Sequence, residues 1–128
     1  MQLTVRNPND GIYPATDDYV HAMEVVGARQ LLFISGTMGL DASGVAPDSV
    51  EEQLRLIWSN LRRILSEAGM TTDNIVRLTS YLRDPCFAQA NQNARITALG
   101  DRRIPTTAIV VQTLDPSWMI EIEAIAAG

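Results

Sequence analysis

The stretch Pro105–Ala127, PTTAIVVQTLDPSWMIEIEAIAA, decides the fold predicted for this chain. It is interpreted as two strands, Thr107–Thr113 and Trp118–Ala126, that form a closing hairpin around the turn Leu114–Ser117. Asp, Pro and Ser favour such a turn, because proline fixes its own φ and the other two bond to nearby backbone. The second strand alternates between isoleucine and glutamate, so its two carboxylates share one face of the sheet.

These two carboxylates, Glu121 and Glu123, are unexpected in so apolar a strand. A buried charge is costly unless it has a partner, so a carboxylate at such a position suggests a functional reason. Glu121 is the candidate catalytic residue. Glu123 is interpreted as facing water.

Length and composition predict one domain over residues 1–128, with a core of ordinary size. No apolar run is long enough to cross a bilayer and no leader-like segment opens the chain, so we expect a cytoplasmic protein without a membrane partner. The single cysteine, Cys86, excludes an internal disulfide, and no histidine or lysine lies beside it to activate the thiol.

All ten basic residues are arginines, and the net charge is −5. The absence of lysine excludes Schiff-base chemistry and a Walker A loop. One histidine and one cysteine make a zinc site improbable. We therefore expect no cofactor and no metal ion, and the acidic charge argues against a nucleic-acid partner.

The remaining chain predicts two helices set between strands. Strands are expected at Gln2–Arg6 and Ile75–Leu82, with a hairpin formed by Tyr19–Val25 and Leu31–Ser35. Helices are expected at Ser49–Ala68, which has capping-box residues at its start and Gly69 at its end, and at Phe87–Leu99.

This order indicates an α+β fold in which a mixed sheet carries both helices on one face. The other face would then be bare, although the strands are largely apolar. An exposed apolar sheet face is best explained as a subunit interface, so a homo-oligomer is expected.

Four segments follow a recognisable pattern, namely Phe33–Gly36, Glu67–Gly69, Asp73–Val76 and, most specifically, Ile120–Ala126. Together they resemble the YjgF/RidA family of imine deaminases, also called endoribonuclease L-PSP. The resemblance covers nearly the whole chain from Tyr19 onward. It implies a chorismate-mutase-like subunit, a homotrimer, and clefts between subunits that bind small 2-keto or 2-imino acids.

The resemblance also implies roles for individual residues. Glu121 matches the glutamate that positions the attacking water, and Tyr19 matches a substrate-binding tyrosine. Ser35 and Gly36 match a serine–glycine pair that lines the pocket, and Asn91 matches a site asparagine in the second helix. His21, on the same expected strand face as Tyr19, is left open as a cleft residue.

One departure from the family pattern concerns substrate binding. Deaminating members carry an arginine after a Pro-Ala pair, where this chain has Pro105-Thr106-Thr107-Ala108. Either Thr106 or Thr107 occupies the arginine position, and a threonine hydroxyl cannot replace a bidentate guanidinium. Arg102 and Arg103 are the nearest substitutes, but both precede Pro105.

Three functions remain open at this point. The first is hydrolysis of an imine or enamine to a ketone and ammonia, on substrates other than ordinary 2-imino acids. The second is binding of a small metabolite without turnover. The third, a ribonuclease, is disfavoured by the acidic charge.

Overall fold

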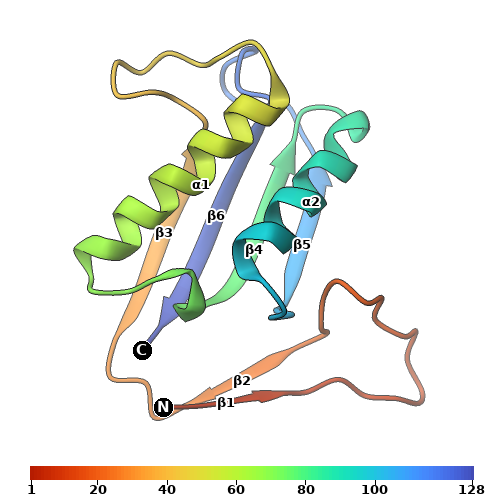
Figure 1. Cartoon of the computed structure of the whole chain (residues 1–128). Coiled ribbons are helices and arrows are strands. Elements are labelled where there is room, and N and C mark those ends of the chain that lie inside the picture. Colours follow the sequence, from red (N-terminus) through yellow and green to blue (C-terminus); the bar gives the residue numbers. More distant parts are fainter.

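The structure, a computed structural model, describes all residues from Met1 to Gly128. The helices are α1 (Val50–Glu67) and α2 (Ala88–Leu99), and the strands are β1 (Gln2–Val5), β2 (Met23–Val26), β3 (Leu31–Met38), β4 (Ile75–Leu82), β5 (Thr106–Val110) and β6 (Ile120–Ala127) (Figure 1). Short 3₁₀ turns precede β4 and α2. The fold is α+β with a mixed sheet and two helices, as predicted. Neither helix has the length and apolar character needed to cross a bilayer.

The main sheet has the strand order β3-β6-β4-β5. β6 is antiparallel to both of its neighbours, and β5 is parallel to β4. The parallel pair needs a crossover connection, which α2 provides. The last strand in sequence therefore lies in the interior of the sheet.

The closing hairpin predicted from Pro105–Ala127 is wrong. The turn after Leu114 forms, with the Asp115 carboxylate accepting a bond from the Ser117 backbone at 2.8 Å. However, the two strands that flank it do not pair, because β4 lies between them. The chain from residue 111 to 119 is long enough to pass over the end of β4 before β6 begins.

The first predicted hairpin is also wrong. β2 begins at Met23, rather than Tyr19, and pairs with β1 in a separate two-stranded sheet. Gly27 has φ +73° and turns the chain away from β2. The Arg29 and Gln30 amides then donate to the Gly128 carbonyl, which places β3 beside β6.

Helix α1 forms as predicted and packs a buried apolar stripe against the sheet. The Ser49 hydroxyl accepts a bond from the Glu52 amide at 3.1 Å, while the Glu52 carboxylate pairs with Arg55, so only half of the expected capping box forms. At the other end, Gly69 has φ +68° and the Met70 amide donates to the Leu65 carbonyl, as in a Schellman motif. The buried stripe of α1 includes Leu54, Ile57, Leu61 and Leu65.

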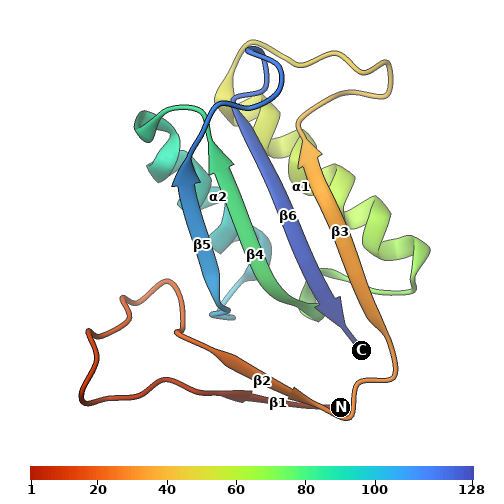
Figure 2. The ribbon, with the colours of Figure 1, turned by 180° about the vertical axis from the view of Figure 1, so that it is seen from behind.

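The two faces of the sheet differ sharply. Ile120, Ile122 and Ala124 of β6 face the helices and are almost completely buried. The opposite face, seen in Figure 2, has no helix over it. On that face Phe33 is 72% exposed in the single chain. We call it the open face, and the predicted absence of a covering element on it is confirmed.

Candidate functional site

The open face gathers polar side chains from all four strands of the main sheet. Directly opposed residues of neighbouring strands point to the same side of a sheet, so the strand register shows which residues lie on the open face. Tyr81 is opposite Glu121, and Thr79 is opposite both Glu123 and Thr107. Arg77 is opposite Ile125. The open face therefore combines two carboxylates, a phenol, a guanidinium and hydroxyl groups.

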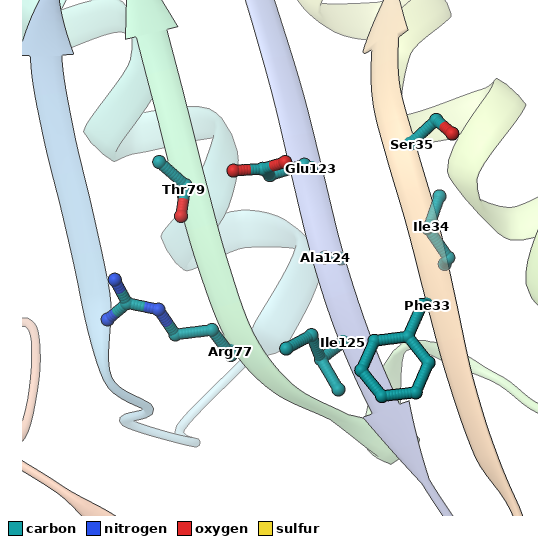
Figure 3. A pocket seen from close by; sticks show the side chains of 8 residues that line it. All are labelled: Phe33, Ile34, Ser35, Arg77, Thr79, Glu123, Ala124 and Ile125. Carbon is teal, nitrogen blue, oxygen red and sulfur yellow. The ribbon is translucent and has the colours of Figure 1, made fainter.

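A concavity of about 400 Å³ lies on this face (Figure 3). Its side chains come from three strands: Phe33, Ser35, Arg77, Thr79, Glu123 and Ile125. A second concavity of about 330 Å³ includes Tyr81, Gln112, Thr113, Glu121 and Glu123. Glu123 lines both, so the two concavities are neighbours along β6.

Glu121 lies against the backbone of β3. A methyl group built at Gly36 would overlap the Glu121 carboxylate. The absence of a side chain at Gly36 is what lets the carboxylate occupy this position. The strand pairing is irregular between Ile34 and Thr37, and this irregularity brings Gly36 to the open face. Glu121 and Gly36 are thus in contact. The roles that the resemblance implies for Glu121, Ser35 and Gly36 stay predictions.

Glu123 points to the uncovered face of the sheet, and it also has a partner there. It is half-buried, and its carboxylate accepts a hydrogen bond from the Tyr81 hydroxyl. This hydrogen bond to a carboxylate, together with burial, raises the pKa of Tyr81 above its usual value of 10.0. Tyr81 therefore stays a neutral donor over the whole physiological pH range.

Thr107, not Thr106, looks onto the open face. The register places Thr107 opposite Thr79, while Thr106 is opposite Leu78, whose side chain is in the core. The Thr107 hydroxyl accepts a hydrogen bond from Arg77 Nη2 at 2.8 Å. The open face thus has a guanidinium beside Thr107 even though position 107 itself is not arginine.

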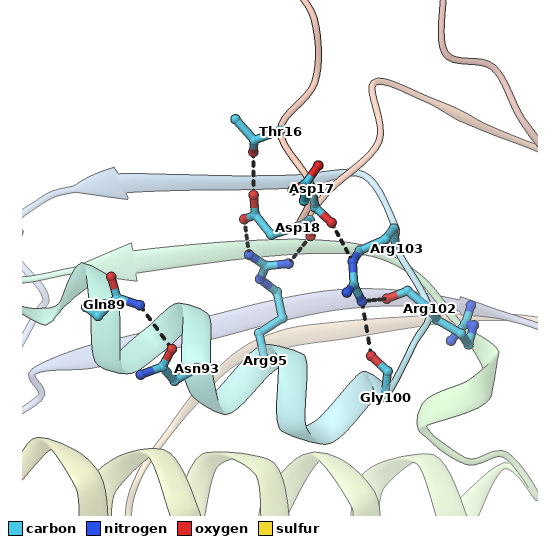
Figure 4. Close-up of polar contacts among 9 residues, drawn as sticks. All are labelled: Thr16, Asp17, Asp18, Gln89, Asn93, Arg95, Gly100, Arg102 and Arg103. Carbon is cyan, nitrogen blue, oxygen red and sulfur yellow. Dashed lines mark hydrogen bonds and ion pairs between the residues drawn. The ribbon is translucent and has the colours of Figure 1, made fainter.

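Arg102 and Arg103 are held elsewhere. The Arg102 guanidinium donates to the Thr72 and Ile75 carbonyls at 2.9 and 2.8 Å. Arg103 donates to the Asp17 carbonyl at 2.6 Å and to the Gly100 carbonyl at 3.1 Å (Figure 4). Arg102 thus holds the turn that leads into β4, and Arg103 joins the segment before β2 to the end of α2, so both guanidinium groups are engaged away from the open face.

The segment before β2 carries Tyr19 and His21, and neither lines the two concavities. His21 Nε2 is bonded to the Tyr13 carbonyl at 2.9 Å, and its ring contacts Tyr19 edge-on. Within one chain, this pair is separate from Glu121. A role for Tyr19 in the cleft stays a prediction that requires a second subunit.

An ion pair fixes this same segment to α2. Arg95, which is 7% exposed, donates to the Asp18 carboxylate at 2.7 Å and to the Asp18 carbonyl at 2.6 Å (Figure 4). A hydrogen bond from Thr16 and the pairing with Arg95 lower the pKa of Asp18, although its partial burial opposes them. The Asp17-Asp18 pair therefore has a clear structural role.

Asn91 lies on the helix side of the sheet. It is 4% exposed, and its side-chain oxygen has no hydrogen-bond partner within the chain. Because α2 packs on the face that holds Ile120 and Ile122, Asn91 and Glu121 are on opposite sides of the sheet. Its predicted role in substrate binding is not supported by proximity within one subunit.

Arg77, Thr79 and Tyr81 were missed by sequence reasoning, although a signal was present. In the strand Ile75–Leu82 they alternate with Leu78, Ser80 and Leu82, so period two already places them together on one face. No group of three or more His, Cys, Asp or Glu side chains is arranged to hold a metal ion.

Comparison with known proteins identifies the family. Residues 12–128 match the family model described as Endoribonuclease L-PSP. The chain belongs to the endoribonuclease L-PSP family. This is the YjgF/RidA family that the sequence resembles.

The chain is similar to several L-PSP family proteins over most of its length. It is 33% identical over 107 residues to the 2-iminobutanoate/2-iminopropanoate deaminase of Mus musculus, covering 80% of this chain and 78% of that protein. It is 29% identical over 106 residues to a RutC family protein of Pyrococcus horikoshii, covering 80% and 83% of the two chains. The crystal structure of YyfB, a Rid family protein from Yersinia pestis, matches all of both chains with a TM-score of 0.84 and 29% identity.

Proposed function

We propose that this L-PSP family protein is a homotrimer that hydrolyses an imine or enamine to a ketone and ammonia in clefts between its subunits. Family membership supports the reaction class, since a relative of 33% identity is named as an imine deaminase. The chorismate-mutase-like arrangement of the trimer and a cytoplasmic location belong to the same proposal. Fold alone does not determine chemistry, so the proposal rests on the site.

The open face supports the assembly. Phe33 is 72% exposed and Ile109 is 44% exposed in the isolated chain. Exposed apolar side chains clustered on one sheet face are typical of an interface between subunits. Packing of three open faces around one axis would enclose the two concavities and exclude bulk water from them.

The contact of the Glu121 carboxylate with Gly36 carries the chemical part of the proposal. A carboxylate held in place beside a concavity can accept a proton from water as the water oxygen attacks the imine carbon. The carbon–oxygen bond forms, and the carbon–nitrogen double bond becomes single as its nitrogen takes up a proton. The proton held by Glu121 would then pass to the amine nitrogen, the carbon–nitrogen bond breaks to release ammonia, and the hydroxyl group loses its proton to become the ketone carbonyl. Ser35 and the backbone around Gly36 would position the substrate.

The substrate is proposed to be other than an ordinary 2-imino acid. Thr107 presents one neutral hydroxyl where deaminating relatives are expected to present an arginine. Charge-assisted hydrogen bonds contribute about 1.5–3 kcal/mol and neutral ones about 0.5–1.5 kcal/mol. The difference corresponds to a loss of binding of roughly tenfold or more.

The same missing arginine favours one alternative, a trimer that binds a small metabolite without turning it over. Ribonuclease activity has less support, because a net charge of −5 disfavours binding to a polyanion.

Ammonia release from a panel of imines and enamines, with and without carboxylates, tests the proposal. Glu121→Gln should abolish turnover of any substrate found. The melting temperature of this variant should be unchanged or higher, because the substitution removes a negative charge that serves the reaction rather than the fold. Glu67→Gln, at the exposed end of α1, is the matched control and should keep full activity. Undiminished turnover by Glu121→Gln would contradict the proposed mechanism, and no turnover by the wild type would favour the binding alternative.

A further inference from the structure

Arg77 is an arginine without an acidic partner on the open face. Its side chain leaves β4, runs toward β5, and donates one hydrogen bond, from Nη2 to the Thr107 hydroxyl. It forms no ion pair with any carboxylate of its own chain. A half-buried guanidinium with most of its five N–H donors unused is an incompletely satisfied cation.

The other arginines that are not exposed are better satisfied. Arg83 donates to three acceptors around Thr113 and Asp115, and Arg95 makes two bonds to Asp18. Arg102 has two carbonyl acceptors and Arg103 has three. Arg77 alone among them has a single neutral acceptor, so it has donors left for something outside the chain.

The surroundings of Arg77 suit a ligand rather than bulk solvent. It lines the 400 Å³ concavity together with the Ser35 and Thr79 side chains and the Phe33 ring. Glu123 also lines this concavity, but in Figure 3 Thr79 lies between Glu123 and the guanidinium. The Glu123 carboxylate is bonded to Tyr81 and does not neutralise Arg77.

We propose that Arg77 binds the carboxylate of the ligand, in place of the arginine that is absent at position 107. This inference rests on the proposed function, because it concerns the substrate of the proposed intersubunit cleft, in which the concavity of Arg77 and the neighbouring concavity of Glu121 would be joined. A guanidinium binds a carboxylate through two parallel bonds, and the unused donors of Arg77 allow this while Nη2 stays near Thr107.

The geometry also assigns a substrate class. The Glu121 carboxylate lies against Gly36 of β3, whereas the Arg77 guanidinium lies beside Thr107 of β5. Three strand spacings separate β3 from β5, on the order of 14 Å. A 2-imino acid has its carboxylate bonded directly to the imine carbon, so it is too short to reach both groups. The substrate is an imine or enamine whose carboxylate is several bonds away from the reacting carbon.

Binding of a series of oxo-carboxylates, which resemble the ketone product, tests this assignment. The series runs from pyruvate through 4-oxopentanoate to 6-oxoheptanoate, with 2-pentanone as the neutral member, and calorimetry measures the affinities on the intact protein. Affinity should rise by about tenfold or more from pyruvate to the longer members, because only those reach Arg77. Arg77→Met should remove this gain and leave 2-pentanone unaffected.

Matched variants separate charge from packing. Arg77→Lys keeps the positive charge but not the fork, so it should recover part of the gain. Arg62→Met, on the exposed side of α1, should bind the whole series like the wild type. Equal affinity for pyruvate and 6-oxoheptanoate, or an Arg77→Met variant that binds the series unchanged, would overturn the proposal.

Two further outcomes are distinguishable. If Arg77→Met dissociates the oligomer, as measured by light scattering, Arg77 is an interface residue that pairs with a neighbouring subunit, and the assignment is wrong. If Arg77 governs binding but no imine is hydrolysed, the carboxylate site stands and the proposed hydrolysis fails.

Discussion

The Tyr81 hydroxyl donates a hydrogen bond to the Glu123 carboxylate, and this pair stands between Glu121 and Arg77 on the open face. It joins two neighbouring strands of the sheet and fixes the direction of one carboxylate. Glu121 accepts no side-chain hydrogen bond from its own chain, so both of its oxygens can accept a proton or a hydrogen bond from water.

The first prediction concerns the ionisation of Tyr81. Because the bond to Glu123 raises the pKa of Tyr81 above 10.0, ultraviolet titration of the three tyrosines should show one that ionises later than the other two. Tyr81→Phe should remove this late component, and Glu123→Gln should move it back toward the usual value. The neutral phenol favours the folded state below pH 10, and this contribution is lost as the pH rises through the raised pKa. Ionisation of all three tyrosines together would contradict the bond.

The second prediction concerns the ion pair between Asp18 and Arg95. Asp18→Asn should destabilise the protein at pH 7 by about 1.5–3 kcal/mol, because the buried guanidinium loses its charged acceptor. The pKa of Asp18 is lowered, so this stabilisation is complete above the usual value of 3.8 and is lost as the pH falls through the lowered pKa. Urea unfolding should therefore show a difference between wild type and variant that shrinks in strong acid. Asp10→Asn, in an exposed turn, is the control, and an equal loss of stability there would contradict the assignment.

The third prediction concerns assembly. The protein should have the mass of a trimer by light scattering, and Phe33→Asp should weaken the assembly by placing a charge on the open face. Val45→Asp introduces the same charge on an exposed loop residue outside that face and should leave the mass unchanged. A folded wild-type monomer at micromolar concentration would exclude both the interface and the cleft.

The fourth prediction concerns the position of the arginine. Exchanging the two side chains, with Thr107→Arg and Arg77→Thr together, should increase activity on 2-iminobutanoate, because a guanidinium on β5 can extend toward the centre of the face. The paired change is needed because Thr107→Arg alone would place two guanidinium groups side by side. Thr106→Arg should instead destabilise the protein, since Thr106 lies on the helix side of the sheet. Equal activities for arginine at 106 and 107 would contradict the register.

The helices and strands of this fold could be predicted more reliably than the pairing of the strands in the sheet. Helix α1 and strand β4 follow from periodicity and caps, which act within a few residues. Both predicted hairpins are wrong because the strand with which a given strand pairs depends on the whole sheet. In the second case, a nine-residue connection before β6 is long enough to cross the end of β4. Two proline-free strands on either side of a good turn do not by themselves specify pairing.

The candidate site was predicted in part. Alternation placed both glutamates on one face, whereas the contact between Glu121 and Gly36 could be seen only in the structure. Arg77 was overlooked because the motif directs attention to residues 105–108, whereas the guanidinium that reaches Thr107 comes from the adjacent strand. The choice between Thr106 and Thr107 needed the register of β5 on β4, which the sequence does not contain.

The central place of β6 has a consequence for how the chain folds. β3 and β4 are synthesised well before the strand that joins them, so β3 and the edge of β4 that faces β6 lack a partner while α1 is already complete. The contacts between β3 and β6 span about 90 residues of sequence, and loops of such length slow folding. The sheet can therefore close only after β6 is synthesised, and until then the free edges of β3 and β4 are sites where another chain could pair.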